Sequence, residues 1–179
     1  TAKEHVGEYR ALSLQTQAVI DDINRQRDVL DKAAADYMAN CYTYLDAQSR
    51  SMTSELNAGA SKAALQERYR KIALMNDIID LGNAIRVANW KGQAFMDGTI
   101  MQEAMGNFRT MVEKIDELQP ITRQAANQAE LRKIEEDGAV YEAGMKQIIS
   151  DYVSLADFNT RRGEAAANVL AAAQELFGD

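Results

Sequence analysis

An apolar seam that advances in alternating steps of three and four residues runs through almost the whole chain, and it restricts the fold more than any other feature. Such steps keep one side of a helix against its neighbours, and the alternation typical of strands is absent. The first stretch of the seam comprises Tyr9, Leu12, Thr16, Val19, Ile23, Gln26, Leu30, Ala33, Tyr37, Cys41, Tyr44, Gln48, Met52 and Leu56. We therefore expect an all-α protein whose first helix covers residues 3–57 and is about 80 Å long.

Three breaks divide the seam into four predicted helices. The breaks are NAGAS at 57–61, Asp97-Gly98-Thr99, and Gln119-Pro120, which contains the only proline. Ser61 is well placed to cap the second helix, and a proline disfavours helical backbone in the residue before it. The helices after the first are expected at about 62–96, 100–118 and 121–177, so their order is long, short, short, long.

This order has a geometric consequence for the two long helices. Short connections make sequence neighbours antiparallel, so the short helices cover only one part of the long ones. We expect a single domain over residues 1–179, with an up-down four-helix bundle at about residues 35–145. The remaining segments, about 3–34 and 146–177, extend from it as a two-helix stem. The stem is an incomplete second bundle, because its apolar seam has nothing in this sequence to cover it.

Composition and charge exclude several classes of function. The net charge is -7, and basic residues are interleaved with acidic ones, which argues against nucleic-acid binding. Cys41 and His5 are the only cysteine and histidine, so we expect neither an internal disulfide nor a metal site. No activated nucleophile or acid–base pair is recognisable, so we expect no catalytic residue, no cofactor and no enzyme activity. The apolar runs are much shorter than the roughly 20 residues that span a membrane.

The segment Leu81–Phe95, LGNAIRVANWKGQAF, departs from a generic bundle helix. Apolar residues with the seam spacing run along it as far as Phe95 and predict the face that enters the core. Beside this face, Arg86, Asn89 and Gln93 form a row of hydrogen-bonding side chains, with Lys91 just behind it. Burying such groups unpaired costs about 1 to 3 kcal/mol each, so they need a partner, either another helix or a small anion.

Three tyrosines fall on seams at the level of the short helices. Tyr37 and Tyr44 lie on the first helix and Tyr141 on the last. Together with Gln48 and Arg86, they are candidates to line a polar cavity for a carboxylate, because their hydroxyls need hydrogen-bond partners. The alternative is that the rings only fill the core while the hydroxyls reach its edge.

A second pair of polar residues interrupts the seam of the last helix. Asn159 and Arg162 occupy consecutive seam positions, where a guanidinium is buried without a charge partner unless an anion meets it. The alternatives are an ion pair with another helix or exposure in the stem. For Arg86 the corresponding alternative is a salt bridge to Asp36 or Asp46, which ties helices together and binds nothing.

Three blocks of the sequence carry a family resemblance. IRVANWKGQAFMD, the acidic MQEAMGNFRTMVEKIDELQPITRQ and the closing VYEAGMKQIISDYVSLADFNTRRGEAAANVLAAAQEL resemble the helical bimodular sensor domain of bacterial methyl-accepting chemotaxis receptors. In that family, two stacked four-helix modules lie outside the cytoplasmic membrane, and each can hold a small carboxylate. The resemblance covers essentially the whole chain, but the first two short helices of the membrane-proximal module have no counterpart here.

The resemblance implies a function and a set of partners. It implies a periplasmic sensor domain of an inner-membrane chemoreceptor that binds a small organic anion and signals by displacing its long helices. It also implies a homodimer, with flanking transmembrane helices outside this sequence. The bundle corresponds to the distal module, where the matching ligand residues are Arg86, Asn89 and Lys91.

In the proximal module the resemblance implies only half of a ligand site. The matching residues on the last helix are Asn159, Thr160 and Arg162, with Ala166 where a hydroxyl is expected. The first-helix arginines of that module are absent from this chain. The main alternative for the whole protein is a structural or adaptor coiled coil without a small-molecule ligand, in which Arg86 and Arg162 only lock the register.

Overall fold

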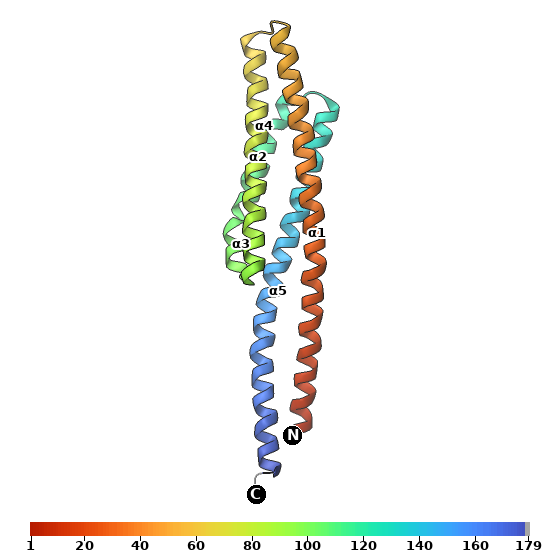
Figure 1. The fold of residues 1–179 in the computed structure, drawn as a ribbon, viewed down its shortest axis with the longest axis vertical. Helices are drawn as coiled ribbons and strands as arrows, with labels where there is room; N and C mark the ends of the chain where they lie inside the picture. The colour runs from red at the N-terminus through yellow and green to blue at the C-terminus, as the bar shows by residue number, and fades with distance from the viewer. Residues whose placement is uncertain (178–179) are drawn as a thin grey trace.

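The structure, a computed structural model, describes residues 1–177, and it describes the side chains of residues 1–175. Within that range the fold is all-α, as predicted. The elements are α1 (Ala2–Asn57), α2 (Lys62–Phe95), α3 (Gly98–Ala104), α4 (Gly106–Leu118), a short 3-10 helix η1 (Gln119–Ile121) and α5 (Ala125–Phe177). The chain runs up α1, down α2, up α3 and α4, and down α5, with both termini at the same end (Figure 1).

The turn between α1 and α2 confirms the predicted helix boundary. Ser61 caps α2, since its Oγ accepts a hydrogen bond from the backbone amide of Ala64 at 3.2 Å. Gly59 has a φ of +68°, a left-handed conformation that glycine adopts without steric cost. The α1–α2 hairpin therefore has local sequence determinants at its turn.

The predicted third helix is divided into α3 and α4, so its continuity was predicted wrongly. At Met105 the backbone hydrogen bonds join residues three apart instead of four. Met105 N donates to Gln102 O, and Phe108 N donates to Met105 O. Such a tightened turn interrupts the α-helical ladder. The apolar face nevertheless stays in phase across the break, because Met101, Phe108 and Ile115 are all buried.

The last helix begins at Ala125, four residues later than expected. Pro120 lies in η1, and Thr122 after it has extended backbone, with φ −95° and ψ 103°. From there α5 continues through Asp137-Gly138 without a break. The predicted register holds from Ile134 to Leu155, where the apolar seam residues are buried, and the first predicted turn is replaced by a connection between α4 and α5.

The core is formed where α2, α3 and α4 pack beside the upper parts of α1 and α5 (Figure 1). Tyr37 of α1 passes close to α2, and its hydroxyl donates to the carbonyl oxygen of Ile78 at 2.7 Å. The close approach is possible because residue 82 is a glycine: a Cβ there would lie 2.5 Å from Tyr37 Cε1. Cys41 is fully buried and fills the core, as predicted.

Below the bundle, α1 and α5 continue as a pair of helices (Figure 1). Leu12 and Ala165 are buried there, at 2% and 1% exposure. Large apolar side chains remain uncovered in the same region, including Leu14 at 65%, Val153 at 69% and Leu170 at 61% exposure. Among the described residues, no helix combines the length and the apolar character needed to cross a bilayer.

Candidate functional site

The structure separates the eight bundle residues that the sequence singled out. Tyr37, Arg86, Asn89, Gln93 and Tyr141 gather at mid-height of the bundle, where four helices meet. Two others, Tyr44 and Gln48, lie higher. Gln48 follows Tyr37 by eleven residues on α1, which is about 16 Å along the helix axis. Lys91 is exposed and lines a groove between α2 and α3. A single cavity lined by all of them does not form.

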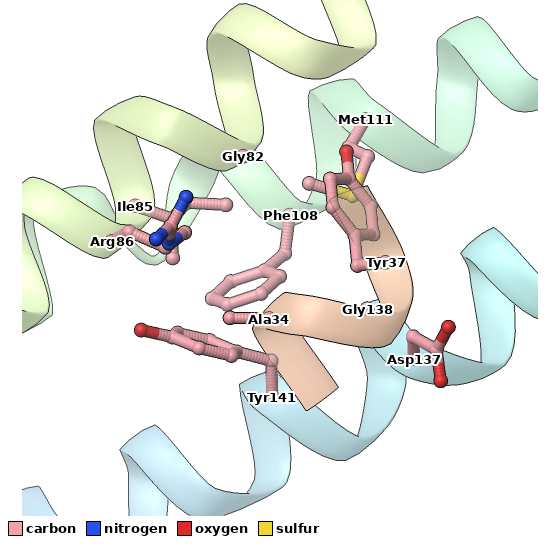
Figure 2. A pocket seen from close by; sticks show the side chains of 10 residues that line it. All are labelled: Ala34, Tyr37, Gly82, Ile85, Arg86, Phe108, Met111, Asp137, Gly138 and Tyr141. Carbon is pink, nitrogen blue, oxygen red and sulfur yellow. The ribbon is translucent and has the colours of Figure 1, made fainter. Parts of the chain in front are cut away.

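The mid-height group borders a small cavity, called the central cavity below. Its lining residues come from α1, α2, α4 and α5 and are Ala34, Tyr37, Gly82, Ile85, Arg86, Phe108, Met111, Asp137, Gly138 and Tyr141 (Figure 2). Its volume is about 20 Å³, which is room for about one water molecule. The aromatic rings of Phe108 and Tyr141 form one side of the cavity, and their centroids are 6.4 Å apart.

Arg86 is the charged group on this side of the cavity. Its guanidinium carbon lies 5.1 Å from the centroid of the Trp90 ring, and Nη1 donates to Asn83 Oδ1 at 3.4 Å. Its Nε is buried and has no hydrogen-bond partner. Within the described residues, Arg86 makes no salt bridge. A buried donor of a cation without an acceptor is energetically unfavourable and favours an anion.

The alternative considered for Arg86, a salt bridge to Asp36 or Asp46, does not form between these residues. Asp36 pairs with Lys32, and Asp46 pairs with Arg50, in each case one helical turn away on α1. These partners share a face of the same helix with the aspartates, so the local pairs form in preference to a pair across the bundle.

A chain of hydrogen bonds runs from α5 through α2 to α1. Asn89 Nδ2 donates to the Tyr141 hydroxyl at 3.0 Å, and Gln93 Nε2 donates to Asn89 Oδ1 at 3.1 Å. Arg27 Nε then donates to Gln93 Oε1 at 2.8 Å. Sequence reasoning missed Arg27; its signal is a position directly after the seam residue Gln26. Burial raises the pKa of Tyr141 to about 12, so its hydroxyl stays protonated at neutral pH.

Asn89 takes the core position that the sequence assigned to the neighbouring apolar row. It is only 1% exposed, whereas Phe95, expected in the core, is 73% exposed. The buried face of α2 instead passes through Ile85, Asn89 and Gly92. Two members of the predicted polar row, Asn89 and Gln93, therefore find hydrogen-bond partners on α5 and α1, whereas Arg86 Nε has none.

An acidic residue lies at the other side of the central cavity. Asp137 points away from Arg86 and Tyr141 in Figure 2, and its Oδ2 accepts a hydrogen bond from Asn40 Nδ2 at 2.9 Å. Burial raises the pKa of its carboxyl. The cavity is thus polarised, with a cation and a phenol at one side and a carboxyl group at the other.

The residues predicted for a proximal half-site lie on the stem. Asn159 and Thr160 are exposed and Arg162 is half-buried, so the expectation that Asn159 occupies the buried seam is wrong. Arg162 Nη2 donates to Asn159 Oδ1 at 3.0 Å, and Thr160 Oγ1 donates to the Ala156 carbonyl at 3.1 Å. Among the described helices, α1 alone packs against α5 here, so Asn159 faces solvent rather than a bundle interior.

Comparisons of the chain with protein families, with curated proteins and with solved structures gave no match in any of the three.

Proposed function

We propose that this chain is the extracytoplasmic ligand-binding domain of a transmembrane chemoreceptor and that it binds a small carboxylate at the central cavity. The observation that carries the proposal is the buried, unpartnered Nε of Arg86 beside a cavity that four helices enclose. A carboxylate there accepts hydrogen bonds from the Arg86 guanidinium and from the protonated Tyr141 hydroxyl. Arginine suits this role because its planar donors match the two oxygens of a carboxylate.

The size of the cavity supplies a mechanism for signalling. A volume of about 20 Å³ has room for about one water molecule, and a carboxylate, with at least three heavy atoms, needs more space than that. Ligand entry therefore requires the walls to move apart. Two of these walls belong to α1 and α5, which continue through the stem to the termini. Because the expanded state alone accommodates the ligand, binding shifts the population of helix positions, and the long helices carry that displacement to the stem.

The stem supports the rest of the assignment. Leu14, Val153 and Leu170 expose apolar surface on helices that carry both termini. We propose that a second copy of the chain covers this surface in a homodimer. Membrane-spanning helices outside this sequence would then hold both copies at the periplasmic side of the inner membrane, with the bundle farthest from the bilayer.

The small volume of the central cavity also favours a second candidate, a structural or adaptor helical protein without a ligand. In that case the hydrogen bonds among Tyr141, Asn89, Gln93 and Arg27 only fix the register of three helices. A thermal-shift screen of carboxylates, amino acids and amines separates the two functions. A ligand that raises the melting temperature supports the sensor, because a ligand that binds only the folded state stabilises it. No response across the panel supports the structural protein.

A further inference from the structure

We infer that a second anion-binding site lies above the central cavity, where the α4–α5 connection meets α1 and α2. The pocket at this place, called the connector pocket below, has a volume of about 170 Å³. Its lining residues are Gln48, Arg68, Lys71, Thr122, Arg123, Gln124 and Asn127. Three of them are cationic, the other four are neutral and polar, and none is a carboxylate. Such a lining matches a small oxyanion.

The pocket concentrates the buried polar residues of the protein. Seven polar or charged residues are buried among those whose burial is described, and four of them line this pocket. They are Gln48 at 1%, Thr122 at 3%, Lys71 at 5% and Asn127 at 7% exposure. Because burying polar groups is unfavourable without hydrogen bonds, such a cluster indicates a site built for a polar occupant.

Two glutamates outside the lining hold the cations in place. Glu55 accepts from Arg68 Nε at 3.1 Å and from Nη2 at 2.6 Å. Glu67 accepts from both terminal nitrogens of Arg123, at 2.8 and 2.9 Å, and from Lys71 Nζ at 3.0 Å. Three cations thus face two carboxylates, which leaves one positive charge for an occupant of the pocket.

Gln48 provides an unpartnered donor in this pocket. Its Nε2 is buried without a hydrogen-bond partner, while its Oε1 accepts from Arg68 Nη1. The donor from Arg68 determines the orientation of the amide, so Nε2 is the atom left for an acceptor. Lys71 Nζ uses one of its three hydrogens on Glu67. Gln124, directly before α5, and Asn127 in its first turn also line the pocket, and the positive end of the helix dipole favours an anion.

The ligand class that fits is a small oxyanion, either a carboxylate or a phosphate. Both present acceptor oxygens to amide and ammonium donors, and both carry the charge that the pocket leaves unbalanced. This site is separate from the central cavity and does not depend on the proposed sensor function. An occupant contacts α1, α2 and the start of α5 together, so it ties the top of the bundle to the helix that leads to the C-terminus.

The experiment titrates the full chain with sodium acetate and, separately, with inorganic phosphate, at constant ionic strength set with chloride. The side-chain amide signal of Gln48 is followed by NMR. We expect this signal to shift saturably with at least one of the two anions, and the anion that shifts it identifies the class. Absence of a saturable shift with both anions overturns the inference and leaves the cluster as a structural ion-pair network.

Two variants test the assignment by calorimetry. Gln48→Glu places a carboxylate of matching length in the pocket and is expected to weaken anion binding at least about tenfold. Arg70→Ala should leave this affinity unchanged, because Arg70 is exposed, pairs with Glu117 and lines neither the connector pocket nor the central cavity. Equal affinity in the wild type and in Gln48→Glu contradicts the inference. If circular dichroism shows that Gln48→Glu is not folded, Lys71→Met takes its place with the same expected loss.

Discussion

Asn89 of α2 donates a hydrogen bond of 3.0 Å to the hydroxyl of Tyr141 on α5, and both residues are buried. The bond joins the helix that bears Arg86 to one of the two helices that lead out of the bundle. A displacement of α2 relative to α5 changes this contact directly. The pair therefore connects the proposed ligand position to the proposed output helix.

Removal of the Tyr141 hydroxyl is expected to destabilise the protein. Tyr141→Phe leaves the Asn89 amide buried without its acceptor, which costs about 1 to 3 kcal/mol. The measurement is the free energy of unfolding from urea titrations. Tyr152→Phe is the matched control, because Tyr152 is also buried on α5 but its hydroxyl has no partner. A loss as large in Tyr152→Phe as in Tyr141→Phe contradicts the importance of the Asn89 contact.

Replacement by alanine is expected to have opposite effects at two glycines, because Gly82 lies in the close contact of α1 with α2 and Gly163 lies in open space on α5. Gly82→Ala forces a Cβ to within 2.5 Å of the Tyr37 ring, whose hydroxyl is bonded to Ile78 O, and overpacking of this kind costs about 1 to 3 kcal/mol. Gly163→Ala meets nothing within 4 Å and is expected to stabilise the helix by about 0.5 to 1 kcal/mol. Thermal unfolding of both variants checks the signs, and a neutral Gly82→Ala would show that Tyr37 moves freely.

The ion pairs at the connector pocket predict a pH dependence. The hydrogen bonds from Arg123 and then Lys71 lower the pKa of Glu67 from 4.5 to about 2. A carboxyl whose pKa is lower in the folded state stabilises the fold fully above its unfolded pKa, and this stability is lost as the pH falls toward 2.

Glu67→Gln measures this contribution by difference from the wild type. At neutral pH the variant is expected to be less stable by about 1 kcal/mol, since the glutamate is partly exposed. The difference should vanish between pH 4.5 and about 2. Glu113→Gln, at an exposed pair with Arg109, is the control and should change stability little at any pH. A Glu67→Gln difference that is independent of pH rules out the charge-based explanation.

The exposed stem predicts self-association. Sedimentation or light scattering of the chain should give the mass of a dimer, because a second copy covers Val153 and its neighbours. Val153→Lys should shift the mass to that of a monomer, since it places a charge in the proposed interface. Val140→Lys, at a site 46% exposed beside the bundle, should not. A monomeric wild type at all concentrations would refute the dimer.

The sequence predicted the helices because their signal is local. The seam spacing and caps such as Ser61 depend only on near neighbours along the chain, and the all-α fold followed from them. The division at Met105 was missed because the apolar face stays in phase on both sides of it. The pairing of Asp36 with Lys32 could also have been predicted from the sequence, because the two residues are one turn apart on the same helix.

The candidate sites were only partly predictable, because they depend on how helices face one another. The sequence analysis placed Tyr44 and Gln48 in one cavity with Arg86, whereas Gln48 lines a different pocket from Arg86. Lys71 was missed, although it lies three residues before Leu74 on the same face and is therefore buried. The association of Lys71 with Gln48 and Arg123 arises from the α4–α5 connection, whose path no periodicity in the sequence indicates.

Calorimetric titration of the wild type and of Arg86→Ala with a panel of small carboxylates tests the central claim most directly. Arg70→Ala is the matched control, because Arg70 is an exposed arginine on the same helix that pairs with Glu117. We predict that at least one carboxylate binds the wild type and Arg70→Ala equally. Arg86→Ala should bind it at least about tenfold more weakly while keeping its helical signal. Equal binding by Arg86→Ala and the wild type, or no binding by any of the three proteins, would contradict the account.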